Sequence, residues 1–349
     1  MQYKNHTVSV QKFQTQKGEV INHLIAKITV YGQITSQKPI ALVYHAFSTN
    51  SLLHEWWDKF NLAKLAQKYT IICCNSLGSS HGSTGPSSVN PETGQKYGLS
   101  FPKISIQDTV NFQKRALLEF GISQVSLVLG CSLGGMQALD MYLRFPNFAE
   151  KWISVAGVPV PYMTKLDNLA QSQLIETAAK AADEENLLNM LMHSRFFFRL
   201  ACTSEQALKV LANRQQHNPG STNLERLERY FTKDNLQFKG QFSPYSNSLY
   251  LRMIAEFELN NIEPANSNAP ELVMVTMQDD RFTPKTSVKE VAESLHGLGY
   301  SVRVLDFTTA FGHEAWIIDG TRFYEFIEKE LYQPTNMHAD TSQLCTDMC

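Results

Sequence analysis

Short apolar runs recur along this chain and alternate with longer amphipathic segments. Runs of this kind are typical of strands that are buried on both faces of a parallel sheet. Segments 106–120 and 285–298 instead repeat their apolar residues at helical spacing. The alternation predicts an α/β fold with a doubly wound, mostly parallel sheet. The predicted strands cover residues 40–44, 69–74, 125–129, 152–155, 272–277 and 302–307.

The strand and helix alternation stops after residue 161 and resumes near residue 270. Early in this interval, residues 168–200 are rich in Ala, Leu, Gln, Glu and Met, which favour helices. We therefore predict that residues 161–265 form a helical cap, or lid, over the active site.

The rest of the chain is predicted to form one core domain, made of residues 1–160 and 266–333. Within it, residues 78–102 are dense in Gly, Pro and Ser and predict a long ordered loop. Residues 334–349 are polar and are expected to form a disordered tail.

Composition narrows the class of partner. The 349 residues include 31 basic and 33 acidic side chains, a formal net charge of −2, which favours small-molecule substrates over nucleic acid or membrane. Residues 1–13 lack the features of a signal peptide, so a cytoplasmic location is expected. The six cysteines have no zinc-site or disulfide spacing, and no metal is predicted.

Residues 125–139 place an apolar strand, a Gly-x-Ser-x-Gly turn and a helix in immediate succession. This order is typical of a nucleophile elbow, in which a strained turn exposes the serine above a sheet. Gly130 and Gly134 remove the Cβ atoms that would clash at such a turn. We predict that Ser132 is the nucleophile and that the Leu133 amide stabilises a developing oxyanion.

A serine nucleophile requires a histidine base and an acid that orients this base. Asp280 follows the predicted strand 272–277, and His313 follows the strand 302–307. Both positions are carboxyl ends of strands, where open α/β sheets place their sites. We predict Asp280 as the acid and His313 as the base of a Ser-Asp-His triad.

The neighbouring Asp279 is an alternative acid. Phe282 and Pro284 follow Asp280 at the spacing of hydrolase acid loops, which favours Asp280. The rival base His296 lies inside a helical pattern, and His338 lies in the polar tail, so neither has a strand-end setting.

The loop after the strand 40–44 is expected to supply a second oxyanion donor. The Phe47 backbone amide is the candidate. His45 in the same loop is predicted to hold the turn by packing and hydrogen bonding rather than to act as a base.

Several further short motifs occur together in one known protein family. They are His45-Ala46, Trp56-Trp57-Asp58, NSLG at 75–78, HGSTGPSSVNP at 81–91, Tyr97-Gly98, Phe101-Pro102 and GGMQAL at 134–139. Together they resemble the homoserine O-acetyltransferases, which are acyltransferases of methionine biosynthesis with an α/β-hydrolase fold. The resemblance extends over most of residues 20–330.

This resemblance implies a two-step, ping-pong reaction. Acetyl-CoA, a co-substrate rather than a bound cofactor, would acylate Ser132, and the hydroxyl of homoserine, deprotonated by His313, would then attack the acyl-enzyme. It also implies a tunnel to the serine and a homodimer formed through the helical caps.

The acceptor site departs from the family pattern. The resemblance assigns the acceptor carboxylate to Arg195 and the acceptor amine to the acidic residue after the catalytic histidine, here Glu314 in place of aspartate. A tyrosine expected seven residues after Arg195 is Cys202. Serine, another hydroxyl compound or water therefore stays open as acceptor, and succinyl-CoA as donor. With water, the chain would be a carboxylic ester hydrolase.

Overall fold

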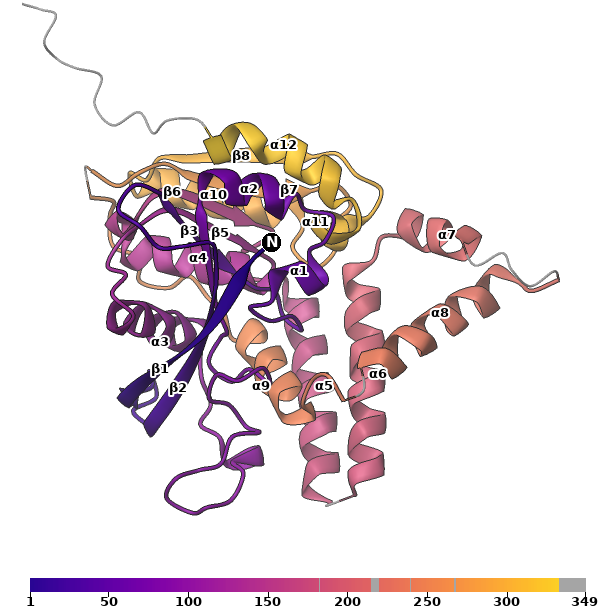
Figure 1. Cartoon of the computed structure of the whole chain (residues 1–349). Coiled ribbons are helices and arrows are strands. Elements are labelled where there is room, and N and C mark those ends of the chain that lie inside the picture. Colours follow the sequence, from indigo (N-terminus) through magenta and orange to yellow (C-terminus); the bar gives the residue numbers. More distant parts are fainter. Residues whose placement is uncertain (182, 215–219, 239, 267, 333–349) are drawn as a thin grey trace, which may run out of the picture.

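The sheet is the framework of the computed structural model, which describes residues 1–181, 183–214, 220–238, 240–266 and 268–332. In this described part the sheet has eight strands in the order β1-β2-β4-β3-β5-β6-β7-β8. From β4 to β8, neighbouring strands pair in parallel. The predicted α/β-hydrolase-type, mostly parallel sheet is therefore confirmed (Figure 1). Its parallel strands are β3 Ile40–Tyr44, β4 Thr70–Cys74, β5 Val125–Cys131, β6 Ala149–Val155, β7 Leu272–Met277 and β8 Val302–Phe307.

The sequence analysis missed an N-terminal antiparallel hairpin. Its strands are β1 Tyr3–Gln14 and β2 Val20–Tyr31, and β2 continues the sheet by pairing antiparallel with β4. Most of β1 is exposed because it is the edge strand. A strand exposed on most of its length shows neither an apolar run nor a clear alternation, so its pattern gave no signal.

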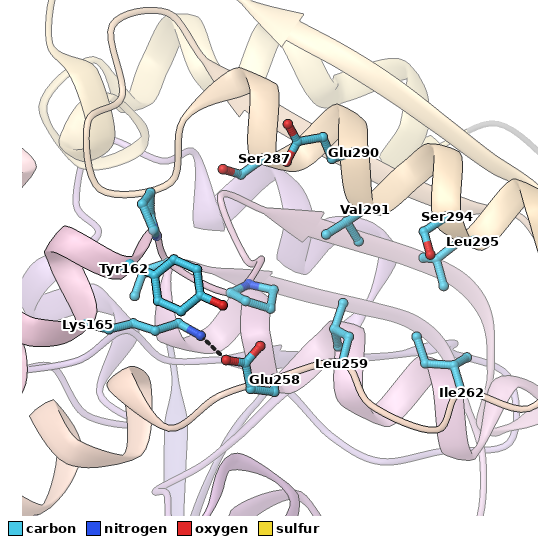
Figure 2. A pocket seen from close by; sticks show the side chains of 13 residues that line it. Tyr162, Lys165, Glu258, Leu259, Ile262, Ser287, Glu290, Val291, Ser294 and Leu295 are labelled. Carbon is cyan, nitrogen blue, oxygen red and sulfur yellow. Dashed lines mark hydrogen bonds and ion pairs between the residues drawn. The ribbon is translucent and has the colours of Figure 1, made fainter.

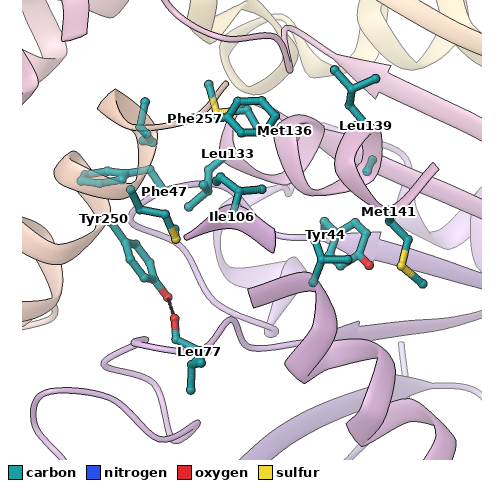
Figure 3. Close-up of a cluster of buried hydrophobic side chains, with 14 of the residues drawn as sticks. Tyr44, Phe47, Leu77, Ile106, Leu133, Met136, Leu139, Met141, Tyr250 and Phe257 are labelled. Atoms are coloured by element: carbon teal, nitrogen blue, oxygen red, sulfur yellow. Dashed lines mark hydrogen bonds between the residues drawn. The ribbon is translucent and has the colours of Figure 1, made fainter. Parts of the chain in front are cut away.

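Helices cover both faces of the sheet. Alternate residues of β3 lie on opposite faces of the sheet. Leu42 and Tyr44 belong to the apolar cluster on one face, and Ala41 and Val43 to the cluster on the other. The first cluster continues into the helices after β6, where the Tyr250 ring lies 6.1 Å from the Phe47 ring, measured between centroids (Figure 3). The helices of the first face are α3 Ile106–Glu119, α4 Leu133–Arg144 and α10 Lys285–Gly297, and those of the second are α1 Leu53–Trp56, α2 Leu62–Lys68, α11 Ala315–Ile318 and α12 Gly320–Tyr332.

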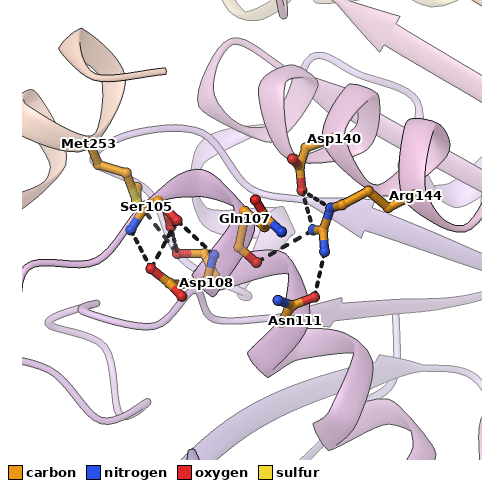
Figure 4. Close-up of polar contacts among 8 residues, drawn as sticks. Ser105, Gln107, Asp108, Asn111, Asp140, Arg144 and Met253 are labelled. Carbon is orange, nitrogen blue, oxygen red and sulfur yellow. Dashed lines mark hydrogen bonds and ion pairs between the residues drawn. The ribbon is translucent and has the colours of Figure 1, made fainter. Parts of the chain in front are cut away.

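Polar contacts tie α3 to α4, the helix that follows the predicted nucleophile. Arg144 on α4 donates to Asn111 and to the Gln107 carbonyl on α3 and pairs with Asp140 (Figure 4). At the start of α3, Ser105 and Asp108 form a reciprocal capping box. These contacts fix the position of α4 against its neighbour.

In the described part of the chain, five helices lie between β6 and β7, within the range predicted for the cap. The paired helices α5 and α6 run side by side away from the sheet, and α9 packs against α5 (Figure 1). None of the helices in the described residues is long and apolar enough to cross a membrane. The predicted tail at 334–349 lies outside the described residues. The five helices are α5 Tyr162–Lys180, α6 Glu184–Cys202, α7 Glu205–Arg214, α8 Asn223–Phe238 and α9 Pro244–Ala255.

Candidate active site

Ser132 lies on a strained turn between β5 and α4. Its backbone has φ 56° and ψ −122°, in a region that non-glycine residues rarely adopt. The flanking glycines are sterically required. A Cβ at Gly130 would lie 2.0 Å from the Gly134 carbonyl oxygen, and one at Gly134 would lie 2.4 Å from the Tyr44 carbonyl oxygen. The turn therefore has the geometry of a nucleophile elbow.

The structure brings together the three residues predicted as a triad. His313 Nε2 lies 2.8 Å from Ser132 Oγ, and His313 Nδ1 lies 2.8 Å from Asp280 Oδ2. All three side chains are buried. When the Nδ1–H of His313 donates a hydrogen bond to the carboxylate, Nε2 keeps a lone pair. This lone pair accepts the hydrogen bond of the serine hydroxyl, as a general base requires.

Asp280, rather than Asp279, reaches the histidine. The Asp280 carboxylate also accepts hydrogen bonds from the Phe282 amide (2.8 Å) and from the amide and hydroxyl of Thr283 (2.8 and 2.7 Å). These donors fix the orientation of the carboxylate toward His313. Asp279, two residues after the end of β7, is exposed and has φ 56°.

The segments that carry the predicted oxyanion donors are adjacent. Leu133 is the first residue of α4, and such an amide has no partner within its own helix. Phe47 belongs to the loop after β3. The space that a Gly134 side chain would need is filled by the carbonyls of Tyr44 and His45, so this loop touches the start of α4. The oxyanion role of both amides stays a prediction.

Both ring nitrogens of His45 are hydrogen-bonded to backbone groups. The Ser76 amide donates to its Nε2 (3.0 Å), so the proton is on Nδ1, which donates to the Ala46 carbonyl (2.9 Å). Burial lowers the pKa of His45 to about 4, and the ring stays neutral. His296 of α10 contacts the Val302 carbonyl, and His338 lies outside the described residues.

Aromatic rings from the cap and from the loop after β7 pack beside the triad. Phe282 lies 4.8 Å from the His313 ring and 5.1 Å from Phe198 of α6, measured between ring centroids. Phe198 stacks on Phe47 at 4.5 Å, and Phe242 lies 6.0 Å from Phe47. The sequence analysis did not identify Phe198 or Phe242. A run of three phenylalanines at 196–198 was the only signal, and helical geometry turns one of them inward.

Arg195 and Glu314, the predicted acceptor residues, each have a partner within the chain. Arg195 pairs with Asp234 of α8 at 3.2 Å and lies over the Phe238 ring. Glu314 pairs with Arg199, one helical turn after Arg195, at 3.3 Å. Sequence reasoning missed Arg199 and Asp234. The spacing of Arg195 and Arg199 was the available signal, because residues four apart share one face of a helix.

Cys202, at the position where the resemblance expects a tyrosine, is a packed thiol. It is fully buried at the end of α6 and belongs to the apolar cluster that joins core and cap. Burial raises the pKa of the Cys202 thiol, and the nearby Glu314 and Asp280 carboxylates raise it further. The thiol is therefore a neutral packing group.

Within the described residues, no cluster of His, Cys, Asp and Glu could hold a metal ion. A surface pocket of about 490 Å³ lies between the start of α5 and α10, with Tyr162, Lys165, Glu258 and Glu290 among its lining residues (Figure 2). None of the triad residues lines this pocket.

Known proteins resemble this chain in sequence and in fold. The family model described as alpha/beta hydrolase fold matches residues 41–303. The homoserine O-acetyltransferase of Geobacter sulfurreducens is 27% identical over 335 residues, which cover 88% of this chain and 91% of that protein. The corresponding protein of Methanohalophilus mahii is 26% identical over 339 residues, which cover 90% of this chain and 69% of that protein. These relatives confirm the resemblance found in the sequence motifs.

Solved structures with the same fold include both transferases and esterases. Esterase E22 matches with a TM-score of 0.80 at 20% identity and covers 95% of this chain and 100% of its own. The homoserine O-acetyltransferase from Bacillus anthracis matches with a TM-score of 0.78 at 20% identity, covering 96% and 99%. At such identity the match shows the fold alone, and it does not distinguish transfer from hydrolysis.

Proposed function

This chain belongs to the alpha/beta hydrolase fold family and is an enzyme, and from that premise we propose that it transfers an acetyl group from acetyl-CoA to homoserine. The observation that carries the proposal is the buried hydrogen-bonded chain from Ser132 through His313 to Asp280. The names of the relatives supply the donor and acceptor. A role in methionine biosynthesis and a cytoplasmic location belong to the same proposal.

The first step acylates Ser132. His313 takes the serine proton while Oγ attacks the thioester carbonyl, and the oxyanion that forms accepts hydrogen bonds from the Leu133 and Phe47 amides. The intermediate then collapses, the C–S bond breaks, and His313 gives its proton to the departing CoA thiolate. An acetyl ester of Ser132 remains.

The second step releases the acetyl group to the acceptor. His313 removes the proton from the hydroxyl of homoserine, the oxygen attacks the ester carbonyl, and Ser132 regains its proton as the new ester leaves. Asp280 holds the imidazole in the required tautomer and stabilises the imidazolium. The aromatic layer of Phe198, Phe242 and Phe282 favours transfer because it limits the access of water to the ester.

We also propose that two copies associate through their caps. The first turns of α5 expose Tyr162, Met163 and Leu166, an unusual amount of apolar surface for one face of a helix. A second copy would cover it. Beyond the acyl-CoA co-substrate, the proposed chemistry requires neither a metal nor a bound cofactor, since the triad supplies nucleophile and base.

A second candidate function is hydrolysis of short carboxylic esters. The specific observation in its favour is that Arg195 and Glu314 already have partners within the chain. Structures of esterases also share the fold.

One experiment separates the candidates. The protein is incubated with acetyl-CoA or succinyl-CoA and then with homoserine, serine or buffer alone, while CoA release, acylation of Ser132 and product are followed. Transfer predicts that homoserine accelerates CoA release several-fold. If release is no faster with homoserine, and a small ester is hydrolysed rapidly, the chain is a hydrolase.

A further inference from the structure

Four charged side chains gather where the cap meets the catalytic loop. Asp234 of α8 lies 3.2 Å from Arg195 and 3.7 Å from Arg199, measured between its Oδ2 and a guanidinium nitrogen of each arginine. Arg199 also lies 3.3 Å from Glu314 Oε2. The group, here called the charge cluster, therefore contains two guanidiniums and two carboxylates, and its formal net charge is zero.

The charge cluster borders the reacting centre on two sides. Glu314 directly follows His313, and the Arg195 guanidinium lies 3.4 Å from the hydroxyl of Ser48, next to the oxyanion candidate Phe47. The cluster is largely buried, but each of its four side chains is partly exposed to solvent. The exposed fractions of the side chains are 13% for Arg195 and Arg199, 24% for Asp234 and 16% for Glu314.

Two polar atoms of the cluster have unused hydrogen-bonding capacity. Among the described residues, the buried Arg199 Nε has no hydrogen-bond partner, and Glu314 Oε2 has the ion pair with Arg199 but no hydrogen bond. Leaving such groups unsatisfied is costly. An N–H group without a hydrogen bond can donate to a ligand carboxylate, and a carboxylate oxygen without a hydrogen bond can accept from a ligand ammonium group. Asp234 differs, because its Oδ2 serves both arginines.

The two arginines are not equally compensated. Burial lowers the pKa of Arg195, and Asp234 offsets this only in part. Burial also acts on Arg199, but Glu314 and Asp234 outweigh it and raise the pKa of Arg199 above its usual value. A further anion would therefore stabilise the charge of Arg195 more than that of Arg199.

We propose that Asp234 is a specificity-determining residue, because its charge brings the cluster to zero and so selects an acceptor with one carboxylate and one ammonium group. In a largely buried site, a ligand that leaves an uncompensated charge is penalised. A zwitterion adds no net charge to the cluster, whereas a hydroxy acid without an amine adds one negative charge. This inference rests on the proposed function and names the acceptor class of the same site.

The test compares ligands of similar size that differ in charge. Hydrolysis of p-nitrophenyl acetate reports on the triad, and inhibition constants are measured for 2-aminobutanoate, a zwitterion, and for butanoate, a monoanion. Neither ligand has a hydroxyl, so neither can accept the acyl group. For the wild-type protein we expect 2-aminobutanoate to inhibit at least about tenfold more strongly than butanoate, equivalent to about 1.4 kcal/mol.

Asp234→Asn changes the cluster to a net charge of +1. We expect the inhibition constant of butanoate to fall at least tenfold and that of 2-aminobutanoate to rise, which reverses the preference. Each constant is measured against the hydrolysis rate of the same variant. Glu228→Gln, an equal change of charge at an exposed position of the same helix, is the matched control and should leave both constants unchanged.

Glu314→Gln is the second variant, for the case that Asp234→Asn does not fold. It also gives a net charge of +1 and should favour butanoate, with a larger loss of 2-aminobutanoate affinity because the ammonium partner is removed. The inference is overturned if wild-type protein binds neither ligand or prefers butanoate, or if a folded Asp234→Asn protein changes the preference by no more than twofold. Where Asp234→Asn does not fold, the same result for Glu314→Gln overturns it.

Failure of this inference differs from failure of the proposed function. Transfer to homoserine with an unchanged ligand preference in Asp234→Asn would remove the role of Asp234 alone. A reversed preference without any transfer to a hydroxy amino acid would instead remove the proposed transferase activity and keep the charge selection.

Discussion

The elbow and the charge cluster, which we propose to contact the same substrate, differ in how they are built. Around Ser132, glycines allow the backbone segments to touch, and Asp280 has a full set of donors. In the charge cluster, long side chains from α6, α8 and the loop after β8 contact one another, and two buried polar atoms have no hydrogen bond to any described residue. From this difference we infer that the core determines how the acyl group is held and that the cap determines which acceptor binds.

The largest expected effect comes from removing the nucleophile. Ser132→Ala should eliminate acylation and lower turnover by about a millionfold or to below detection, because the triad acts as a unit. Mass spectrometry of the protein after incubation with acetyl-CoA checks the acylation. Retained acylation at another residue would contradict the assignment of Ser132.

A change of the acid separates the two candidate aspartates. Asp280→Asn should lower turnover by about ten-thousandfold, because an amide at this position favours the wrong imidazole tautomer. Asp279→Asn is the control, since that side chain is exposed, and should change turnover by less than about twofold. Steady-state kinetics with a small ester measure both. Equal losses would mean that the acid is shared or misassigned.

The rigidity of the elbow can be tested by adding one methyl group. Gly130→Ala should lower the free energy of unfolding by about 3 kcal/mol or more, because its Cβ would overlap the backbone of Gly134. Gly297→Ala in α10 is the matched control, since open space surrounds that position, and should be neutral or slightly stabilising. Denaturant titration measures both values. A Gly130→Ala protein as stable as the control would show that the elbow tolerates side chains.

Acid should destabilise the loop beside the elbow through His45. Burial lowers the pKa of His45 to about 4 from its ordinary value of 6.5, so the unfolded chain binds the proton more tightly than the folded one. This contribution to stability is complete above pH 6.5 and is lost as the pH falls toward 4. Between pH 7 and pH 5 it should amount to about 2 kcal/mol.

Denaturant titration at the two pH values measures this loss. The variant His45→Gln cannot titrate and should lose about 2 kcal/mol less stability than the wild type between them. An equal loss in both proteins would assign the acid sensitivity to other groups.

The smallest expected effect concerns the aromatic layer of the cap. Phe198→Ala should admit water and raise the ratio of hydrolysis to transfer on the order of fivefold, about 1 kcal/mol of barrier. Phe197→Ala is the control, because the neighbouring ring is half exposed and points away from this layer. Product analysis after acetylation gives the ratio. A larger change for Phe197 than for Phe198 would contradict the placement of this layer.

Sequence reasoning succeeded where local patterns determine structure. The parallel strands are apolar runs, and the turn at Ser132 carries its own glycine signature, so the positions of Ser132, Asp280 and His313 at strand ends could be predicted together. The exposed strand β1 has no such pattern and was missed. Arg199 and Asp234 were missed for a different reason. Their pairing depends on how α6 and α8 pack in three dimensions, which no local periodicity encodes.

Single-turnover discharge of the acyl-enzyme tests most directly the claim that the core holds the acyl group and the cap chooses its acceptor. Ser132 is acetylated by a short exposure to acetyl-CoA, free donor is removed, and loss of the acetyl group is followed with homoserine, with 4-hydroxybutanoate and with buffer alone. We expect homoserine to discharge the enzyme at least tenfold faster than either of the others. Equal rates with all three would contradict it.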